Sequence, residues 1–251
     1  MIRIVLIGSG NVAFHLHRAL AAASGVELIQ MVARRPGVFR DFDPGIARAI
    51  LDQPIAKADV YLLAVADGAL EAVAARLRDQ DGLVAHTSGA RGLDALDGIS
   101  RKGIFYPLQT FSRQRELDFA DIPLCIETSL PEDLPLLRNL AESLSGRVVE
   151  MDEEKRRQLH LAAVFVNNFS NHMVCLGETL CREIGLPENI LRPLLRETFS
   201  KLDILSAYQA QTGPARRGDT ITQQAHLGQL KDSLQRELYQ VISESIRQTY
   251  D

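Results

Sequence analysis

The sequence lacks the features that mark disulfide-rich, zinc-binding and membrane proteins. It contains no tryptophan and only three cysteines, Cys125, Cys175 and Cys181, which have no CxxC spacing. This pattern is typical of reduced, mostly buried thiols in the cytoplasm and argues against a disulfide framework or a zinc site. No stretch reaches about 18 uninterrupted apolar residues, so no membrane span is predicted.

A basic excess is also missing. Lys and Arg number 28 against 32 Asp and Glu, which gives a net charge of −4, and the basic residues are dispersed. Because nucleic-acid-binding proteins usually gather a basic excess on one face, no nucleic-acid partner is expected. A hydrophobic content of 46% is ordinary for a globular protein, and 251 residues suffice for two domains. The composition therefore predicts a cytoplasmic, globular, two-domain protein.

Short apolar runs alternate with helical patterns up to about residue 151. Strands are predicted at 2–7, 26–32, 59–65, 82–86, 102–106, 122–127 and 147–151, and helices at 11–23, 68–79 and 132–145. This alternation is the signature of βαβ units around a parallel sheet. We therefore predict that residues 1–151 form a doubly wound α/β domain.

The strand signals stop after Glu150, and long helical patterns follow. Helices are predicted at 153–184, 187–206 and 219–249, separated by Gly185-Leu186-Pro187 and Thr212-Gly213-Pro214. Residues 152–251 are therefore predicted to form a second, all-helical domain.

A glycine turn directly follows the first predicted strand and opens a helix. The segment reads Ile7-Gly8-Ser9-Gly10-Asn11-Val12-Ala13 and fits GxGxxA. In this motif the first glycine permits a tight turn, the second lets backbone approach a pyrophosphate, and the small last residue allows close helix–strand packing. The helix N-terminus then favours the negative charge. We predict that Gly8, Ser9, Gly10, Asn11 and Val12 bind a dinucleotide; the alternative is a glycine turn that caps a helix without a ligand.

The end of the second predicted strand indicates which dinucleotide the protein binds. It reads Met31-Val32-Ala33-Arg34-Arg35-Pro36 and lacks the acidic residue that binds an adenosine ribose 2′-hydroxyl. The guanidinium groups of Arg34 and Arg35 can pair with a 2′-phosphate, which favours NADP over NAD. Two solvated loop arginines are the alternative.

Two further strand ends carry candidate cofactor contacts. They read Ala64-Val65-Ala66-Asp67 and His86-Thr87-Ser88-Gly89. Strand carboxyl ends line the ligand crevice of open parallel sheets, so Ala64, Val65, Ser88 and Gly89 are predicted to contact the cofactor. Ser88 and Gly89 equally suit a plain turn, and Asp67 suits a helix N-cap.

Six motifs together resemble one protein family. GSGNVAFHL, AVAD, HTSGA, YPLQTF, LHLAAVFVNNF and QTGPARRGD occur in this order across nearly the whole chain. They resemble Rossmann-like proteins whose helical C-terminal half is a domain of unknown function, the 2520 family. That family is similar to pyrroline-5-carboxylate reductases, deazaflavin-linked NADP oxidoreductases and β-hydroxyacid dehydrogenases. The resemblance implies an NADP-binding domain, a homodimer formed through the C-terminal helices, and an active site between the domains.

The resemblance also assigns residues. The histidine and asparagine of the family's long helix fall on His160 and Asn168, and its TGP…RGD stretch falls on Thr212, Gly213, Pro214, Arg217, Gly218 and Asp219. In two places this chain departs from the family. Ala66 stands where a proline is common, and Tyr106 stands where a histidine commonly precedes Pro107. Related dehydrogenases often carry Lys and Asn one turn apart on this helix, a pair that this chain does not reproduce.

The stretch 159–180 reads as a buried helix that carries polar side chains. On an α-helical wheel Val164, Asn167 and Asn171 fall within about 40° of His160, and Asn168 is about 80° away. Buried polar groups need hydrogen-bond partners. We expect His160 to act as a general acid and Asn168 to orient the substrate. Asn167, Asn171 and His172 are expected to form hydrogen bonds at an interface.

The sequence thus predicts a cytoplasmic NADP-dependent oxidoreductase. Hydride would pass to or from a small carbonyl or imine substrate between the domains, with Thr110, Thr212 and Arg217 as substrate contacts. A non-catalytic NADP-binding or sensing protein with a helical interaction module is the alternative, and the missing Lys–Asn pair favours it. No metal is expected, since His15 and His17 point to different sides of a helix.

Overall fold

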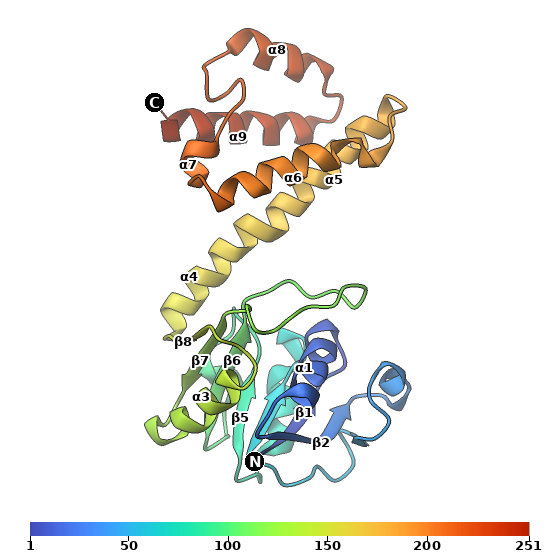
Figure 1. The fold of residues 1–251 in the computed structure, drawn as a ribbon, viewed down its shortest axis with the longest axis vertical. Coiled ribbons are helices and arrows are strands. Elements are labelled where there is room, and N and C mark those ends of the chain that lie inside the picture. Colours follow the sequence, from blue (N-terminus) through green and yellow to red (C-terminus); the bar gives the residue numbers. More distant parts are fainter. Residues whose placement is uncertain (251) are drawn as a thin grey trace. The chain divides into compact units, whose positions relative to one another are not determined.

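The chain forms two compact units, which a computed structural model describes over residues 1–250 (Figure 1). The first unit spans Met1–Asn171 and contains the sheet. The second unit begins at His172 and is helical. The strands end at Glu150, close to the predicted boundary between residues 151 and 152, whereas the first compact unit also includes the helical segment up to Asn171.

An eight-stranded sheet organises the first unit. Its strands are β1 (Ile2–Ile7), β2 (Val26–Ala33), β3 (Ala47–Ile50), β4 (Val60–Leu63), β5 (Leu83–His86), β6 (Lys102–Pro107), β7 (Leu124–Thr128) and β8 (Val148–Glu150). They lie in the order β3-β2-β1-β4-β5-β6-β7-β8. The chain therefore winds outward in both directions from β1, as predicted for a doubly wound sheet.

The strands are apolar on both faces because helices cover both sides of the sheet. In β1, Ile4 and Leu6 belong to one core cluster, which includes buried residues of α1 (Asn11–Ala22) and α3 (Leu134–Glu142). Val5 and Ile7 belong to the opposite cluster, with residues of α2 (Leu70–Ala74). The alternation follows from the two-residue period of a strand, and it fixes the register of β1.

Two features of the sheet differ from the prediction. β3 was not predicted, because it is a four-residue edge strand with only Ala49 buried and so has almost no hydrophobic pattern. β7 runs antiparallel to β6, whereas the sequence pattern predicts parallel strands. No α-helix lies between these two strands within residues 1–250, so the chain returns from the same edge instead of crossing over.

The helix predicted at 11–23 is confirmed as α1, whereas the other predicted helices are broken into shorter pieces. The remaining helices are α4 (Glu153–Ala163), α5 (Ser170–Glu183), α6 (Arg192–Ser200), α7 (Ala207–Ala210), α8 (Thr220–Gln229) and α9 (Ser233–Tyr250). The helix predicted at 68–79 is only α2 between two 3₁₀ turns, and its apolar residues Leu70, Val73, Ala74 and Leu77 are all buried. Within residues 1–250 no helix is long and apolar enough to cross a membrane.

Aspartate caps explain one break in the second unit. The helix predicted at 219–249 is two helices, α8 and α9. The Asp219 carboxylate accepts a hydrogen bond from the Thr222 amide at the start of α8, and the Asp232 carboxylate accepts one from the Gln235 amide at the start of α9. A second capping aspartate begins a new helix where the periodicity alone predicted a continuous one.

The stretch 159–180 is not a buried helix in the single chain. Phe165 is 61% exposed and Val166 is 70% exposed, and Leu161 and Phe169 are also exposed. The segment is not a single α-helix either, because Val164–Phe169 forms a π-helical turn between α4 and α5. Leu161, Phe165, Val166 and Phe169 therefore present apolar surface, although the rings of Phe165 and Phe169 pack against each other with centroids 5.1 Å apart.

Candidate functional site

A cleft of about 620 Å³ lies at the carboxyl ends of β1, β2, β4 and β5. It lies where the strand order reverses, between β1 and β4, which is the usual ligand crevice of open α/β sheets. Of the predicted cofactor residues, Gly8, Ser9, Gly10, Asn11, Val12, Arg34, Ala64 and Val65 line it. Its volume lies within the range of about 300–1,000 Å³ that small-molecule and cofactor sites occupy.

The glycine turn has the geometry that a dinucleotide requires. Gly8 has φ +140°, and a Cβ there would lie 2.1 Å from the Ala64 carbonyl oxygen, so only glycine fits between β1 and β4. A Cβ on Gly10 would meet nothing within 4 Å, which leaves open space on the cleft side. No side chain caps α1 at Gly10, and its first turn carries no acidic residue. The N-terminal amides of α1 are therefore available to an anion, and the residues present fit a bound pyrophosphate.

The loop after β6 braces this turn. The Asn11 side-chain amide donates a hydrogen bond to the Phe111 carbonyl at 2.9 Å. The Arg113 guanidinium donates to the Ser9 carbonyl, pairs with Asp41, and lies over the ring of Phe14. Because C=O and N–H point in opposite directions across a trans peptide, holding the Ser9 carbonyl also fixes the direction of the next amide. No motif or spacing in the sequence predicts this role of Arg113.

Arg34 and Arg35 are both exposed beyond the end of β2. Arg34 lines the cleft and Arg35 does not. Neither guanidinium forms an ion pair or a hydrogen bond with any residue in the described part of the chain, 1–250. Both are therefore free to meet a 2′-phosphate at this edge of the cleft.

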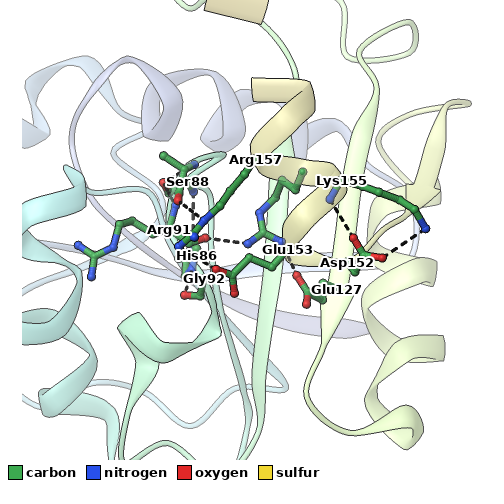
Figure 2. Close-up of polar contacts among 11 residues, drawn as sticks. His86, Ser88, Arg91, Gly92, Glu127, Asp152, Glu153, Lys155 and Arg157 are labelled. Carbon is green, nitrogen blue, oxygen red and sulfur yellow. Dashed lines mark hydrogen bonds and ion pairs between the residues drawn. The ribbon is translucent and has the colours of Figure 1, made fainter. Parts of the chain in front are cut away.

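The HTSGA loop after β5 is a structural turn at Ser88. The Ser88 hydroxyl accepts hydrogen bonds from the amides of Ala90 and Arg91, at 3.2 and 3.1 Å. Fully buried His86 donates from Nε2 to the Gly92 carbonyl and accepts the Ser88 amide at Nδ1 (Figure 2). Burial lowers the pKa of His86, which keeps its imidazole neutral for this arrangement. Ser88 and Gly89 do not line the cleft, whereas the neighbouring Thr87 does.

Helix α4 is attached to this same loop. Figure 2 shows Glu153 and Arg157 of α4 beside the loop that carries Ser88, Arg91 and Gly92. Arg157 donates from Nε to the Ala90 carbonyl at 3.2 Å. Next to it, fully buried Arg156 forms an ion pair with Glu127 of β7 and donates to the Arg91 carbonyl at 2.8 Å. These contacts hold the start of α4 against the sheet.

His160 lies one helical turn beyond Arg156. It lines a second cavity of about 340 Å³ together with Tyr106 and Thr110. The Nδ1 atom of His160 lies 3.1 Å from the Tyr106 hydroxyl. The structure thus brings the predicted catalytic histidine together with the residue that departs from the family pattern.

Asn167 and Asn168 both reach the cleft from the π-helical turn. We predict a cleft role for Asn168, from the family resemblance, and an interface role for Asn167; in the structure both side chains line both cavities. The wider turn of a π-helix changes the angle between successive side chains, and such turns are frequent at functional sites. The two cavities share Gln109, Thr110, Asn167 and Asn168, so they adjoin at these four residues.

Two predicted substrate contacts lie in the second unit. Thr212 and Arg217 are both exposed in the segment before α8. Their predicted role as substrate contacts remains a prediction. Lys155, exposed at the start of α4, pairs with Asp152 and lines neither cavity.

Comparisons with known proteins identify both halves of the chain. Residues 2–111 match the model of the Rossmann-like domain, and residues 122–246 match that of a domain of unknown function, DUF2520. Curated proteins provide no match to the sequence. The structure of a candidate NADP oxidoreductase from Bacteroides fragilis is 36% identical, covers 98% of both chains and has a TM-score of 0.90.

Two more distant structures share the fold. A Thermotoga maritima protein is 21% identical, with a TM-score of 0.83 over 98% of this chain and 99% of its own. The 1-pyrroline-5-carboxylate reductase of Streptococcus pyogenes is 14% identical, with a TM-score of 0.62 over 98% of each chain.

Substitution of the two turn glycines separates folding from binding. Gly8→Ala is expected to lower stability by about 2 kcal/mol or more, because of its positive φ and the contact with Ala64. Gly10→Ala should leave the melting temperature unchanged but weaken dinucleotide binding at least tenfold, about 1.4 kcal/mol, because its methyl group enters the pyrophosphate space. Thermal unfolding and cofactor titration measure both.

Gly37→Ala is the matched control for the glycine experiment, since a Cβ there also meets nothing within 4 Å and the residue lies outside the cleft. A folded Gly10→Ala protein that binds the dinucleotide as tightly as the Gly37→Ala protein would contradict a pyrophosphate at this turn.

Proposed function

Since the chain belongs to the family of Rossmann-like proteins that carry the domain of unknown function DUF2520, we propose that it is an NADP-dependent oxidoreductase acting on a small carbonyl or imine substrate. One observation carries the proposal. The cleft at the glycine turn adjoins the cavity of His160, and four polar or amide side chains line both. A dinucleotide in the first cavity would place its reactive end beside a substrate in the second.

The proposed cofactor is NADP. Arg34 and Arg35 leave two guanidinium groups free beyond β2, where the adenosine ribose lies in dinucleotide-binding sheets. A 2′-phosphate would give one or both a charge-assisted partner. The 36% identical relative, described as a candidate NADP oxidoreductase, supports the same cofactor.

His160 is the proposed proton donor and acceptor. When bound, the cofactor supplies the hydride chemistry. His160 gives one proton to the carbonyl oxygen or imine nitrogen as the adjacent carbon is reduced, and takes it back in the opposite direction, since imidazoles titrate near neutral pH. Asn168 and Thr110 are placed to orient the substrate in the same cavity. Thr212 and Arg217 are proposed as further substrate contacts, with Arg217 suited to an anionic group.

The proposed assembly is a homodimer formed through the helical part of the chain. The exposed apolar side chains of Leu161, Phe165, Val166 and Phe169 support it, because neighbouring exposed apolar side chains often mark an interface. The three cysteines are all free thiols, which supports a cytoplasmic location for the enzyme.

Arg34→Ala tests the choice of cofactor. Loss of a guanidinium–phosphate pair is expected to weaken NADPH binding about tenfold to hundredfold and to leave NADH binding unchanged. Fluorescence titration with both reduced cofactors measures the two effects. Arg40→Ala is the control, an exposed arginine in the same segment that does not line the cleft. Equal losses for NADPH and NADH in the Arg34 variant would remove the 2′-phosphate argument.

Acceptor-dependent oxidation of NADPH tests the enzymatic proposal. Small ketoacids, cyclic imines including pyrroline-5-carboxylate, and flavin-type acceptors are the compounds to screen. With an active acceptor, His160→Gln should lower kcat about 10²-fold to 10⁴-fold without changing NADPH affinity. The control is His172→Gln, at an exposed histidine that lines neither cavity.

Tight NADPH binding without turnover of any acceptor would argue against the enzyme and for the non-catalytic NADP-binding or sensing protein. For such a sensing protein, we expect NADPH binding to change the monomer–dimer equilibrium, and sedimentation with and without NADPH measures that change.

The dimer is tested by sedimentation. The wild-type protein is expected at twice the 27.8 kDa of one chain. A double substitution, Phe165→Asp with Val166→Asp, should shift it toward the monomer because two charges would be buried unpaired at the interface. Gln158→Asp adds a charge to an exposed polar position of α4 and should leave the dimer intact. A monomeric wild-type protein would contradict the proposed assembly.

A further inference from the structure

His160 has one side-chain partner. Its Nδ1 atom lies 3.1 Å from the Tyr106 hydroxyl, and the two rings meet edge to face with centroids 5.9 Å apart. Its other ring nitrogen, Nε2, has no hydrogen-bond partner among residues 1–250. Both side chains line the 340 Å³ cavity. Nδ1 is thus committed to the tyrosine, and Nε2 is the nitrogen left for a substrate.

Tyr106 is held rigidly. It lies near the carboxyl end of β6, is 8% exposed, and packs in a small core cluster with Ile104 and Cys125. Cys125 pairs with it across the antiparallel β6–β7 ladder. Burial raises the pKa of Tyr106 to about 12, so the phenol keeps its proton near neutral pH. A protonated phenol can both donate and accept a hydrogen bond.

Gly89 leaves the space in which the two rings meet. A Cβ at this position would lie 2.6 Å from Cζ of Tyr106 and 2.7 Å from Nδ1 of His160. Gly89 is not among the glycines with positive φ, so the need for glycine here comes from space and not from the backbone. Gly89 of the HTSGA loop therefore contributes to the candidate site by leaving room for the two rings to meet.

We propose that Tyr106 is a positioning residue, which holds the imidazole of His160 in one orientation through both protonation states and so assigns proton transfer to Nε2. When the imidazole is neutral with its proton on Nε2, the phenol donates to Nδ1. When Nδ1 carries a proton, as in the imidazolium and in the neutral form left after transfer from Nε2, Nδ1–H donates to the phenol oxygen. The role of Nε2 in proton transfer rests on the proposed function, whereas the orientation of the ring does not.

The proton balance of the reduction is simple. With the reduced cofactor bound to supply a hydride to the substrate carbon, Nε2 of the imidazolium would give one proton to the substrate oxygen or nitrogen. The C=O or C=N π bond is lost, and one C–H bond and one O–H or N–H bond form. His160 is left neutral with its remaining proton on Nδ1, hydrogen-bonded to Tyr106, until solvent returns a proton to Nε2.

The test is nitrogen NMR of the imidazole in the free, full-length protein. At about pH 8.5, where an imidazole is ordinarily neutral, the wild-type His160 should show a hydrogen-bonded, unprotonated Nδ1 and a protonated Nε2. Tyr106→Phe removes only the hydroxyl and should change the Nδ1 signal and the balance of the two tautomers. The His160→Gln spectrum identifies the His160 signals among the six histidines.

Two further variants control the NMR experiment. Gly89→Ala retains both side chains but inserts a methyl group between them, and it should change the His160 signals in the same direction as Tyr106→Phe. Tyr239→Phe removes the same kind of hydrogen bond from His226, whose Nδ1 lies 2.9 Å from the Tyr239 hydroxyl in the second unit. It should change the His226 signals and leave those of His160 unaltered.

Kinetics add a second readout once an acceptor is known. Tyr106→Phe should lower kcat about tenfold or more and leave KM unchanged, because the ring orientation matters for proton transfer rather than for binding. His160 signals identical in the wild-type and Tyr106→Phe proteins would overturn the inference. Since the NMR measurement needs no substrate, failure to find turnover would count against the proposed function alone.

Discussion

The candidate site depends on the contacts that the buried guanidinium of Arg156 forms with the sheet. It is fully buried at the start of α4, where it pairs with Glu127 of β7 and donates to the Arg91 carbonyl. A buried charge is stable only when it is paired and hydrogen-bonded, so these contacts fix α4 at one place on the sheet. His160 lies four residues later, on the same side of the helix, and meets Tyr106 of β6 as a consequence.

Much of the first unit could be predicted from the sequence. Parallel strands buried on both faces read as apolar runs, and a turn with positive φ and no room for a Cβ needs glycine. The GxGxxA turn after β1 and the free arginines after β2 follow directly from local sequence. β3 and the direction of β7, a strand predicted at 122–127, could not be predicted in the same way. The first is too short to show a period, and the direction of the second depends on how a long loop returns to the sheet.

The candidate catalytic residues were predictable only in part. His160 and Asn168 came from the resemblance to a family, but their surroundings depend on contacts between distant segments. The hydrogen bond to Tyr106, the space left by Gly89 and the brace formed by Arg113 join positions far apart in the chain. The π-helical turn that contains Asn167 and Asn168 lies in a sequence that reads as an ordinary helix. The interface role of Asn167 stays a prediction, and the structure adds that this side chain lines both cavities.

The central claim is that one continuous site joins the glycine turn to His160. A crystal structure with NADP⁺ bound tests it most directly. The account predicts a 2′-phosphate within about 2.7–3.2 Å of a guanidinium nitrogen of Arg34 or Arg35, and a nicotinamide ring beside Asn167 and Asn168, where the two cavities adjoin. A nicotinamide ring bound elsewhere, with the His160 cavity separated from it by protein, would contradict the account.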